Sequence, residues 1–169
     1  MASASVLAPF IRKWEGGFAK HPADPGGATK WGVTLNTYRM YYGMYRTEND
    51  LKNMTEDQWN NIFIRGFWDR ALATQIVSQS VANMLVDWGW NAGMKTAIKA
   101  IQRILGTTQD GIMGPITIGF INRAEPRDLF NKLYEARKNY YKDLILRRPS
   151  MAVFYKGWMN RINDLKFIG

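Results

Sequence analysis

The segment "WEGGFAKHPADPGGATKWGVT", residues 14–34, interrupts an otherwise helical pattern and gathers polar chemistry into one irregular loop. Within it, Glu15 is followed by eight residues and then Asp24, and Asp24 is followed by four residues and then Thr29. Its last six residues, "TKWGVT", are typical of a strand in a small hairpin. The segment therefore predicts a loop with a short β-hairpin that carries two carboxyl groups and a hydroxyl.

The rest of the chain is predicted to be helical, which makes the fold class mainly α. Gly16-Gly17 provides the left-handed turn that ends a helix over 5–15, in which Pro9 is tolerated because it lies near the first turn. Thr55 is a helix cap, with acidic residues in the first turn after it. Apolar residues recur at helical spacing in four later segments, 59–67, 74–93, 97–105 and 126–147. In the last of these, the residues expected to face inward are Leu129, Leu133, Ala136, Tyr140 and Leu144. Residues 160–165 end a last short helix.

Length, composition and charge limit the class of protein. The chain has 169 residues, 46% of them hydrophobic, and no cysteine, which suits one domain or one domain with a small appendage and excludes disulfides and thiolate chemistry. Residues 95–169 carry 14 basic and 6 acidic side chains, a net charge of +8, whereas residues 1–94 carry 9 and 8, a net charge of +1. The basic half indicates a polyanionic partner (nucleic acid, an anionic envelope surface or an anionic polysaccharide) or a solubilising surface.

The polar residues of the loop fit glycosidic bond cleavage. This reaction needs a protonated acid at the leaving oxygen and usually a second carboxylate across the sugar ring. Glu15 is expected at the end of a helix, where the negative pole of the helix dipole favours a protonated carboxyl. Asp24 is then placed to stabilise positive charge or activate water, and Thr29 to hold that water. The plain alternative is a surface helix end followed by an ordinary turn.

The same segment resembles a known family. Glu, eight residues, Asp and a nearby Thr look like the catalytic triad of phage-type lysozymes, although the spacing from Asp24 to Thr29 is one residue shorter here. "WEGGF" with "DPGGATKWGVT" more closely resembles the glycoside hydrolase family 108 muramidases of phages and prophages. The resemblance implies a lysozyme-like helical fold with a small β-hairpin beside Glu15. It also implies that Glu15 is the general acid, with Asp24 and Thr29 as further catalytic residues and Trp31 in the substrate cleft.

Two further patches extend the resemblance. "LVDWGWNAG", residues 85–93, is similar to the family's middle helix and implies that Trp88, Trp90 and Asn91 line the sugar cleft. The alternative there makes Trp88 a core residue and Asp87 a helix-surface group. "AIQRILGTTQDGIMGPITI", residues 100–118, looks like a small peptidoglycan-binding module, which implies wall contacts by Asp110 and Thr117. Asp110-Gly111 and Gly114 also read as ordinary turns.

The other constellations are weak. His21 is the only histidine, so we expect neither a histidine metal site nor a Ser-His-Asp hydrolase, and we expect no metal and no cofactor. Tyr140-Tyr141 among basic residues suggests nucleic acid, but the helical spacing is typical of a core and its rim. We expect no nucleic-acid partner and a monomer.

The resemblance as a whole implies an endolysin-type N-acetylmuramidase. Its substrate is the β-1,4 bond between N-acetylmuramic acid and N-acetylglucosamine of peptidoglycan. Residues 1–94 form the expected catalytic region, and residues 95–169 a binding-like module in the same globule. The first residues lack a signal-peptide pattern, so we expect synthesis in a host cytoplasm and release to the wall by a holin or a dedicated route. Two alternatives stay open: a lytic transglycosylase that gives 1,6-anhydro ends, and a non-enzymatic protein that binds the cell wall or nucleic acid.

Overall fold

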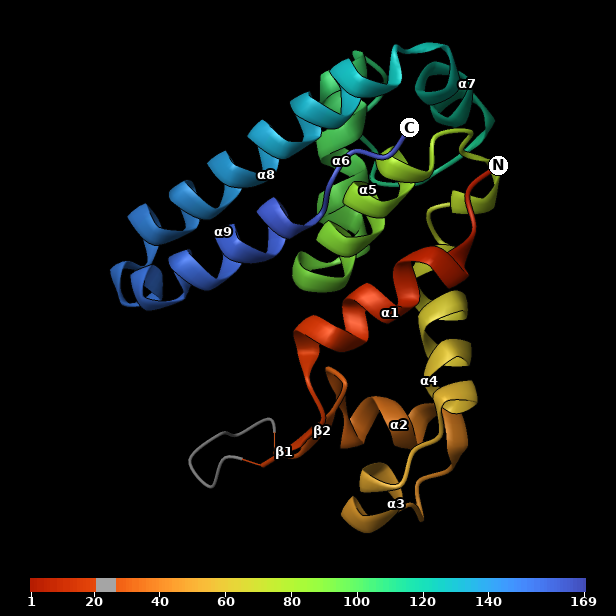
Figure 1. The fold of residues 1–169 in the computed structure, drawn as a ribbon, viewed down its shortest axis with the longest axis vertical. Helices are drawn as coiled ribbons and strands as arrows, with labels where there is room; N and C mark the ends of the chain where they lie inside the picture. Colours follow the sequence, from red (N-terminus) through yellow and green to blue (C-terminus); the bar gives the residue numbers. More distant parts are fainter. Residues whose placement is uncertain (21–26) are drawn as a thin grey trace. The chain divides into compact units, whose positions relative to one another are not determined.

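The computed structural model describes residues 1–20 and 27–169, which form two compact units (Figure 1). The N-terminal unit is Ala4–Gly66, and the C-terminal unit joins Met1–Ser3 to Phe67–Gly169. The first residues belong to the C-terminal unit because the Ala2 N–H donates to the Ile76 carbonyl at 2.8 Å.

The N-terminal unit combines helices with a small sheet. Its helices are α1 (Ala4–Glu15), α2 (Leu35–Tyr42), α3 (Glu48–Lys52) and α4 (Glu56–Phe63), and a π-helix (Ile64–Trp68) follows. The strands β1 (Phe18–Ala19), β2 (Thr29–Lys30) and β3 (Val33–Thr34) form an antiparallel sheet in the order β1-β2-β3. The expected small hairpin is confirmed, but "TKWGVT", expected as one of its strands, forms the two strands β2 and β3 and the turn between them, with Lys30 opposite Val33.

Local signals in the sequence set these elements. Thr34 caps α2, and Thr47 and Thr55 form capping boxes at the starts of α3 and α4. The cap predicted at Thr55 is therefore confirmed. Pro9 was expected near the first turn of its helix, and it is the sixth residue of α1. This position is in the second turn, next to the first. The core of the unit consists of fully buried apolar side chains, among them Leu7, Ile11, Leu51, Trp59 and Phe63.

The C-terminal unit is built around one central helix. A 3-10 turn (Ala73–Gln75) leads to α5 (Gln79–Ala92), which packs against α6 (Met94–Leu105) and α8 (Pro126–Arg147). Along the chain, α7 (Pro115–Arg123) follows α6 and packs against it. A 3-10 segment (Pro149–Phe154) then leads from α8 to α9 (Tyr155–Asp164), which lies beside α8 (Figure 1). Residues from Ser80 to Gly89 are all buried, as expected for a helix enclosed on every side.

Comparison with the expected helices gives one match and two differences. The expected bounds of α8 are those observed. The helix expected over 74–93 begins at Gln79 instead, because the Ser78 hydroxyl caps it by accepting from the Val81 N–H. On α8, Leu129 and Leu133 are buried as expected, but Arg137 and Tyr141 are buried where Ala136, Tyr140 and Leu144 were expected. The buried face includes Arg137 because its charge is paired inside the unit.

Within the described residues, the search for a helix long and apolar enough to cross a membrane found none.

Candidate active site

Glu15 is the last residue of α1, and its side chain is half-buried. Gly16 follows with φ of +74°, and its N–H donates to the Arg12 carbonyl at 3.0 Å. A residue without Cβ takes this left-handed conformation at no steric cost, so the Gly-Gly pair ends the helix here. The sequence therefore fixes Glu15 at a helix C-terminus, from which the chain turns into the sheet.

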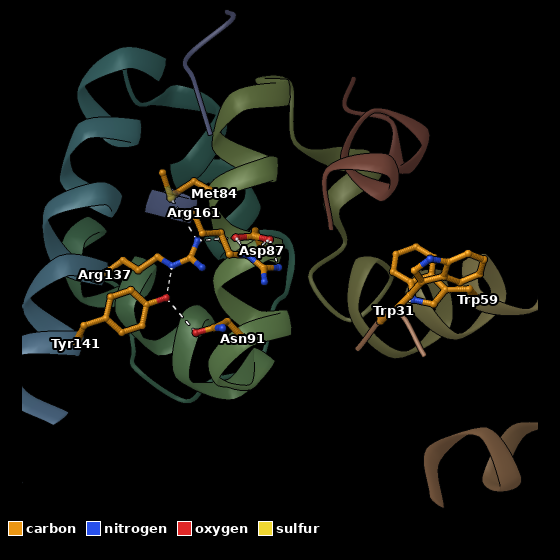
Figure 2. Close-up of polar contacts among 8 residues, drawn as sticks. All are labelled: Trp31, Trp59, Met84, Asp87, Asn91, Arg137, Tyr141 and Arg161. Atoms are coloured by element: carbon orange, nitrogen blue, oxygen red, sulfur yellow. Dashed lines mark hydrogen bonds and ion pairs between the residues drawn. The ribbon is translucent and has the colours of Figure 1, made fainter. Parts of the chain in front are cut away.

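The turn between β2 and β3 has two residues, both with positive φ. Trp31 has φ of +48° and Gly32 has φ of +82°, the pattern of a type I′ hairpin turn. Positive φ is strained for a bulky residue such as Trp31. Its conformation is fixed by Trp59, whose ring N–H donates to the Trp31 carbonyl at 3.0 Å (Figure 2).

Glu15 lies directly against this turn. A Cβ placed on Gly32 would lie 2.8 Å from Cγ, 2.9 Å from Cδ and 3.0 Å from Oε2 of Glu15. Such distances are too short for real side chains, so only glycine lets the carboxyl group occupy this position. The helix end and the hairpin tip, far apart in the loop sequence, thus meet at one carboxyl group.

Arg12 connects the surrounding side chains, one turn before Glu15. Its guanidinium group lies 4.8 Å from the centre of the Trp59 ring and 5.9 Å from that of Trp31. It also donates to Asn60 Oδ1 at 2.8 Å and pairs with Glu56 Oε1 at 3.2 Å. This network holds the two tryptophans and so supports the hairpin tip.

Of the three residues expected to be catalytic, the structure describes Glu15 and Thr29 but not Asp24. Thr29 is half-buried in β2, opposite Ala19 on one side and Thr34 on the other. It therefore belongs to the hairpin whose tip contacts Glu15. Asp24 and His21 lie outside the described residues. Their assignments rest on the sequence.

A different carboxylate is buried in the C-terminal unit. Asp87 has no exposed surface, and its oxygens meet Arg137 Nη1 at 2.9 Å and Arg161 Nη2 at 2.8 Å (Figure 2). Burial alone would raise the pKa of this carboxyl group, but the two guanidinium groups outweigh it and hold the pKa below its usual range. The interpretation of Asp87 as a helix-surface group is therefore wrong. The core position proposed for Trp88 is confirmed, at 2% exposure.

This cluster extends to Asn91. Arg137 Nε donates to the Tyr141 hydroxyl at 2.8 Å, and that hydroxyl donates to Asn91 Oδ1 at 3.0 Å (Figure 2). Burial raises the pKa of the Tyr141 phenol, so it remains a proton donor. Asn91 is exposed at the end of α5, and its amide orientation is set by this bond. Trp90, half-buried, has its ring 4.6 Å from that of Phe67.

Gln102 organises the turn that contains Asp110 and also contacts Thr117 in the first turn of α7. The buried Gln102 amide donates to Asp110 Oδ1 at 2.9 Å, to the Ile112 carbonyl and to Thr117 Oγ1, and accepts from the Gly111 N–H. The Ile112 N–H and this amide hold the pKa of the Asp110 carboxyl below its usual range. Asp110 is exposed, whereas Thr117 is buried. The predicted turn is confirmed. Wall contact by either residue stays a prediction.

Three features of this geometry were missed from the sequence. The contact of Gly32 with Glu15 had a local signal, a Trp-Gly pair between two strand-like segments. The support of the turn by Arg12 and Trp59 had none. The pairing of Asp87 with Arg137 and Arg161 had none either, because these residues are far apart along the chain.

Comparison with known proteins gives matches over both regions. The model of the glycosyl hydrolase 108 family matches residues 8–93, and that of a predicted peptidoglycan domain matches residues 96–163. Among solved structures, SagA from Brucella abortus is similar with a TM-score of 0.82 and 27% identity, over 95% of this chain and 90% of that one. None of the curated proteins compared with the chain matches it. The expected lysozyme-like, mainly α fold class is confirmed.

Proposed function

We propose, from the membership of this chain in the glycosyl hydrolase 108 family, that it is an N-acetylmuramidase with Glu15 as its general acid. The family and the peptidoglycan domain make the chain a glycoside hydrolase that acts on peptidoglycan. The proposal adds the bond, β-1,4 between N-acetylmuramic acid and N-acetylglucosamine, and the residue that protonates its oxygen.

The observation that carries this proposal is the position of the Glu15 side chain against Gly32. A general acid must be held in one place and must remain reachable by the leaving oxygen. Gly32, which has no Cβ, leaves the space beside the hairpin turn that the Glu15 side chain fills. The side chain is half-buried and so remains accessible. Trp31 at the same tip offers an aromatic face of the kind on which sugar rings stack.

The proposed reaction uses the loop residues as follows. Glu15 gives its proton to the glycosidic oxygen as the bond to the anomeric carbon breaks. Asp24 stabilises the oxocarbenium-like centre or activates water, and Thr29 positions that water, whose attack leaves a reducing muramic acid end. Trp90 and Asn91 are proposed as sugar contacts, and Asp110 and Thr117 as wall contacts.

The test compares Glu15→Gln with Glu135→Gln, which makes the same change at an exposed helix position beside Lys138. We expect Glu15→Gln to lower the rate of turbidity loss of purified walls by about 10² to 10⁴-fold with little change in melting temperature, because the substitution removes mainly a titratable proton. Glu135→Gln should lyse walls like the wild type. Normal lysis by Glu15→Gln would refute the assignment.

Product analysis distinguishes the muramidase from a lytic transglycosylase. Mass spectrometry of the digest should give reducing muramic acid ends, because water is the proposed nucleophile. Asp24→Asn should lower the rate strongly, but less than Glu15→Gln if Asp24 only assists. Products with 1,6-anhydro ends, together with an active Asp24→Asn variant, would favour the transglycosylase.

A further inference from the structure

A groove of about 560 Å³ opens between α6 and α8 in the C-terminal unit, and it shares no lining residue with the pocket at the Gln102 turn. Of the residues expected at the substrate, only the almost fully buried Trp88 lines it. Its chemistry comes from two aromatic rings, three cations and one carboxylate, supplied by Trp88, Tyr140, Lys99, Arg103, Arg147 and Asp143.

The groove has an excess of positive charge. Within the described residues, no ion pair joins Lys99, Arg103 or Arg147 to a carboxylate. The Arg103 side chain donates to the neutral Gln109 Oε1 at 3.2 Å, and that of Arg147 to the backbone carbonyl of Asp143 at 3.4 Å. These partners orient the guanidinium groups without neutralising them. Cations gathered in one concave site raise the local concentration of anionic ligands.

The groove is lined by aromatic rings that pack on one another and by a lysine stem that packs on the backbone. The Trp88 and Tyr140 ring centres are 5.9 Å apart, and Tyr140 in turn stacks on Tyr141. The Lys99 stem lies close to Gly111: a Cβ there would be 3.3 Å from Lys99 Cγ. The site therefore offers the half-buried Tyr140 ring, backed by the buried Trp88, next to a cation whose stem is already positioned. This combination suits a ligand with both aliphatic and carboxylate groups.

We propose that this groove binds the carboxylate-bearing peptide stem of peptidoglycan, an inference that rests on the proposed function for its choice of polymer. The excess of cations favours the peptide over the neutral parts of the glycan. The volume falls within the range of small-molecule sites, roughly 300–1,000 Å³. It therefore suits a stem of a few residues rather than a long anionic polymer.

The test titrates a soluble disaccharide-tetrapeptide from peptidoglycan, with free carboxylates, into the full chain carrying Glu15→Gln. We expect the added pair Lys99→Gln and Arg103→Gln to weaken binding about tenfold or more, because each cation contributes a charge-assisted hydrogen bond. The control pair, Lys142→Gln and Lys156→Gln, removes the same charge from exposed positions outside the groove. It should change affinity less than twofold.

Three results would overturn the proposal. One is equal weakening by the groove pair and the control pair, which would leave net charge as the cause. Another is equal affinity for a probe whose carboxylates are amidated. The third is tighter binding of a phosphate-bearing wall polymer than of the muropeptide at the same groove.

A second substrate separates this proposal from the proposed function. Glycan strands stripped of peptide should be cleaved at wild-type rate by the groove pair in a chain with Glu15 intact, because they have no stem to bind. If the wild type itself fails to cleave them, the proposed function is wrong. The muropeptide titration would still test the groove.

Discussion

Glu15 and Asp87 are carboxylates that the chain surrounds in opposite ways. Glu15 ends α1, is half-buried and lies against a glycine at a hairpin tip. Asp87 lies within α5, is fully buried and contacts two guanidinium groups. A carboxyl group that exchanges protons with a substrate must be reachable, whereas one enclosed between two arginines is held ionised. The two environments fit the catalytic role proposed for Glu15 and a structural role for Asp87.

The largest expected effect on stability is that of Asp87→Asn. It leaves Arg137 and Arg161 buried without their counter-charge, and breaking a buried pair in this way costs about 3–5 kcal/mol. Urea unfolding should show this loss, while Asp128→Asn, which breaks the exposed pair with Lys132, should cost about 0–1 kcal/mol. Similar losses for the two variants would mean that Asp87 is not the ionic centre of the C-terminal unit.

The pH dependence of stability tests whether the loss in Asp87→Asn comes from the charge of Asp87. The pKa of Asp87 is lower in the folded state than its unfolded value of about 3.9, so the folded state binds this proton less tightly. Its contribution is present above about pH 4 and is lost as the pH falls from there toward the folded pKa. The difference in unfolding free energy between the wild type and Asp87→Asn should therefore shrink below about pH 4. A constant difference would contradict the ionised state.

The contrast between the two carboxylates also explains what the sequence could predict. The helix end at Glu15 and the hairpin after it were predicted because their signals lie within 21 residues of one another. The helix α8 was bounded correctly because Pro126 at its start is a local signal. Asp87 was misplaced because Arg161 lies 74 residues away and Arg137 lies on another helix. In the sequence, the apolar residues around a buried carboxylate form the same pattern as those beside a surface carboxylate. The two cases can be told apart only when the residues that pair with the carboxylate are known.

The substitution Gly32→Ala tests whether activity depends on the position of the Glu15 side chain against Gly32. The new methyl group would meet the Glu15 side chain and would require alanine at φ of +82°. A displacement of about 1 Å at a catalytic group can cost about 10²-fold in rate, and the left-handed backbone costs about 1–2 kcal/mol. Wall turbidity assays should show the loss of rate, with melting temperatures measured alongside.

Gly106→Ala is the matched control for backbone strain. Gly106 has φ of +75°, but its methyl group would meet no atom within 4 Å. It should lose similar stability and keep its activity. If both variants lost activity alike, strain rather than contact with Glu15 would be the cause.

The smallest expected effect is that of Tyr141→Phe, which removes the hydroxyl between Arg137 and Asn91 but keeps the ring on Trp158. Arg137 Nε would lose its acceptor next to Nη2, which already has no partner among the described residues. The expected loss is about 1–2 kcal/mol by urea unfolding, against less than about 0.5 for Tyr45→Phe, whose side chain is exposed. Because Arg137 contacts both Tyr141 and Asp87, the double variant Asp87→Asn/Tyr141→Phe should deviate from additivity by at least about 0.5 kcal/mol. Strict additivity would mean that the Tyr141–Asn91 bond is independent of the buried charge, and that Asp87 does not help to orient Asn91.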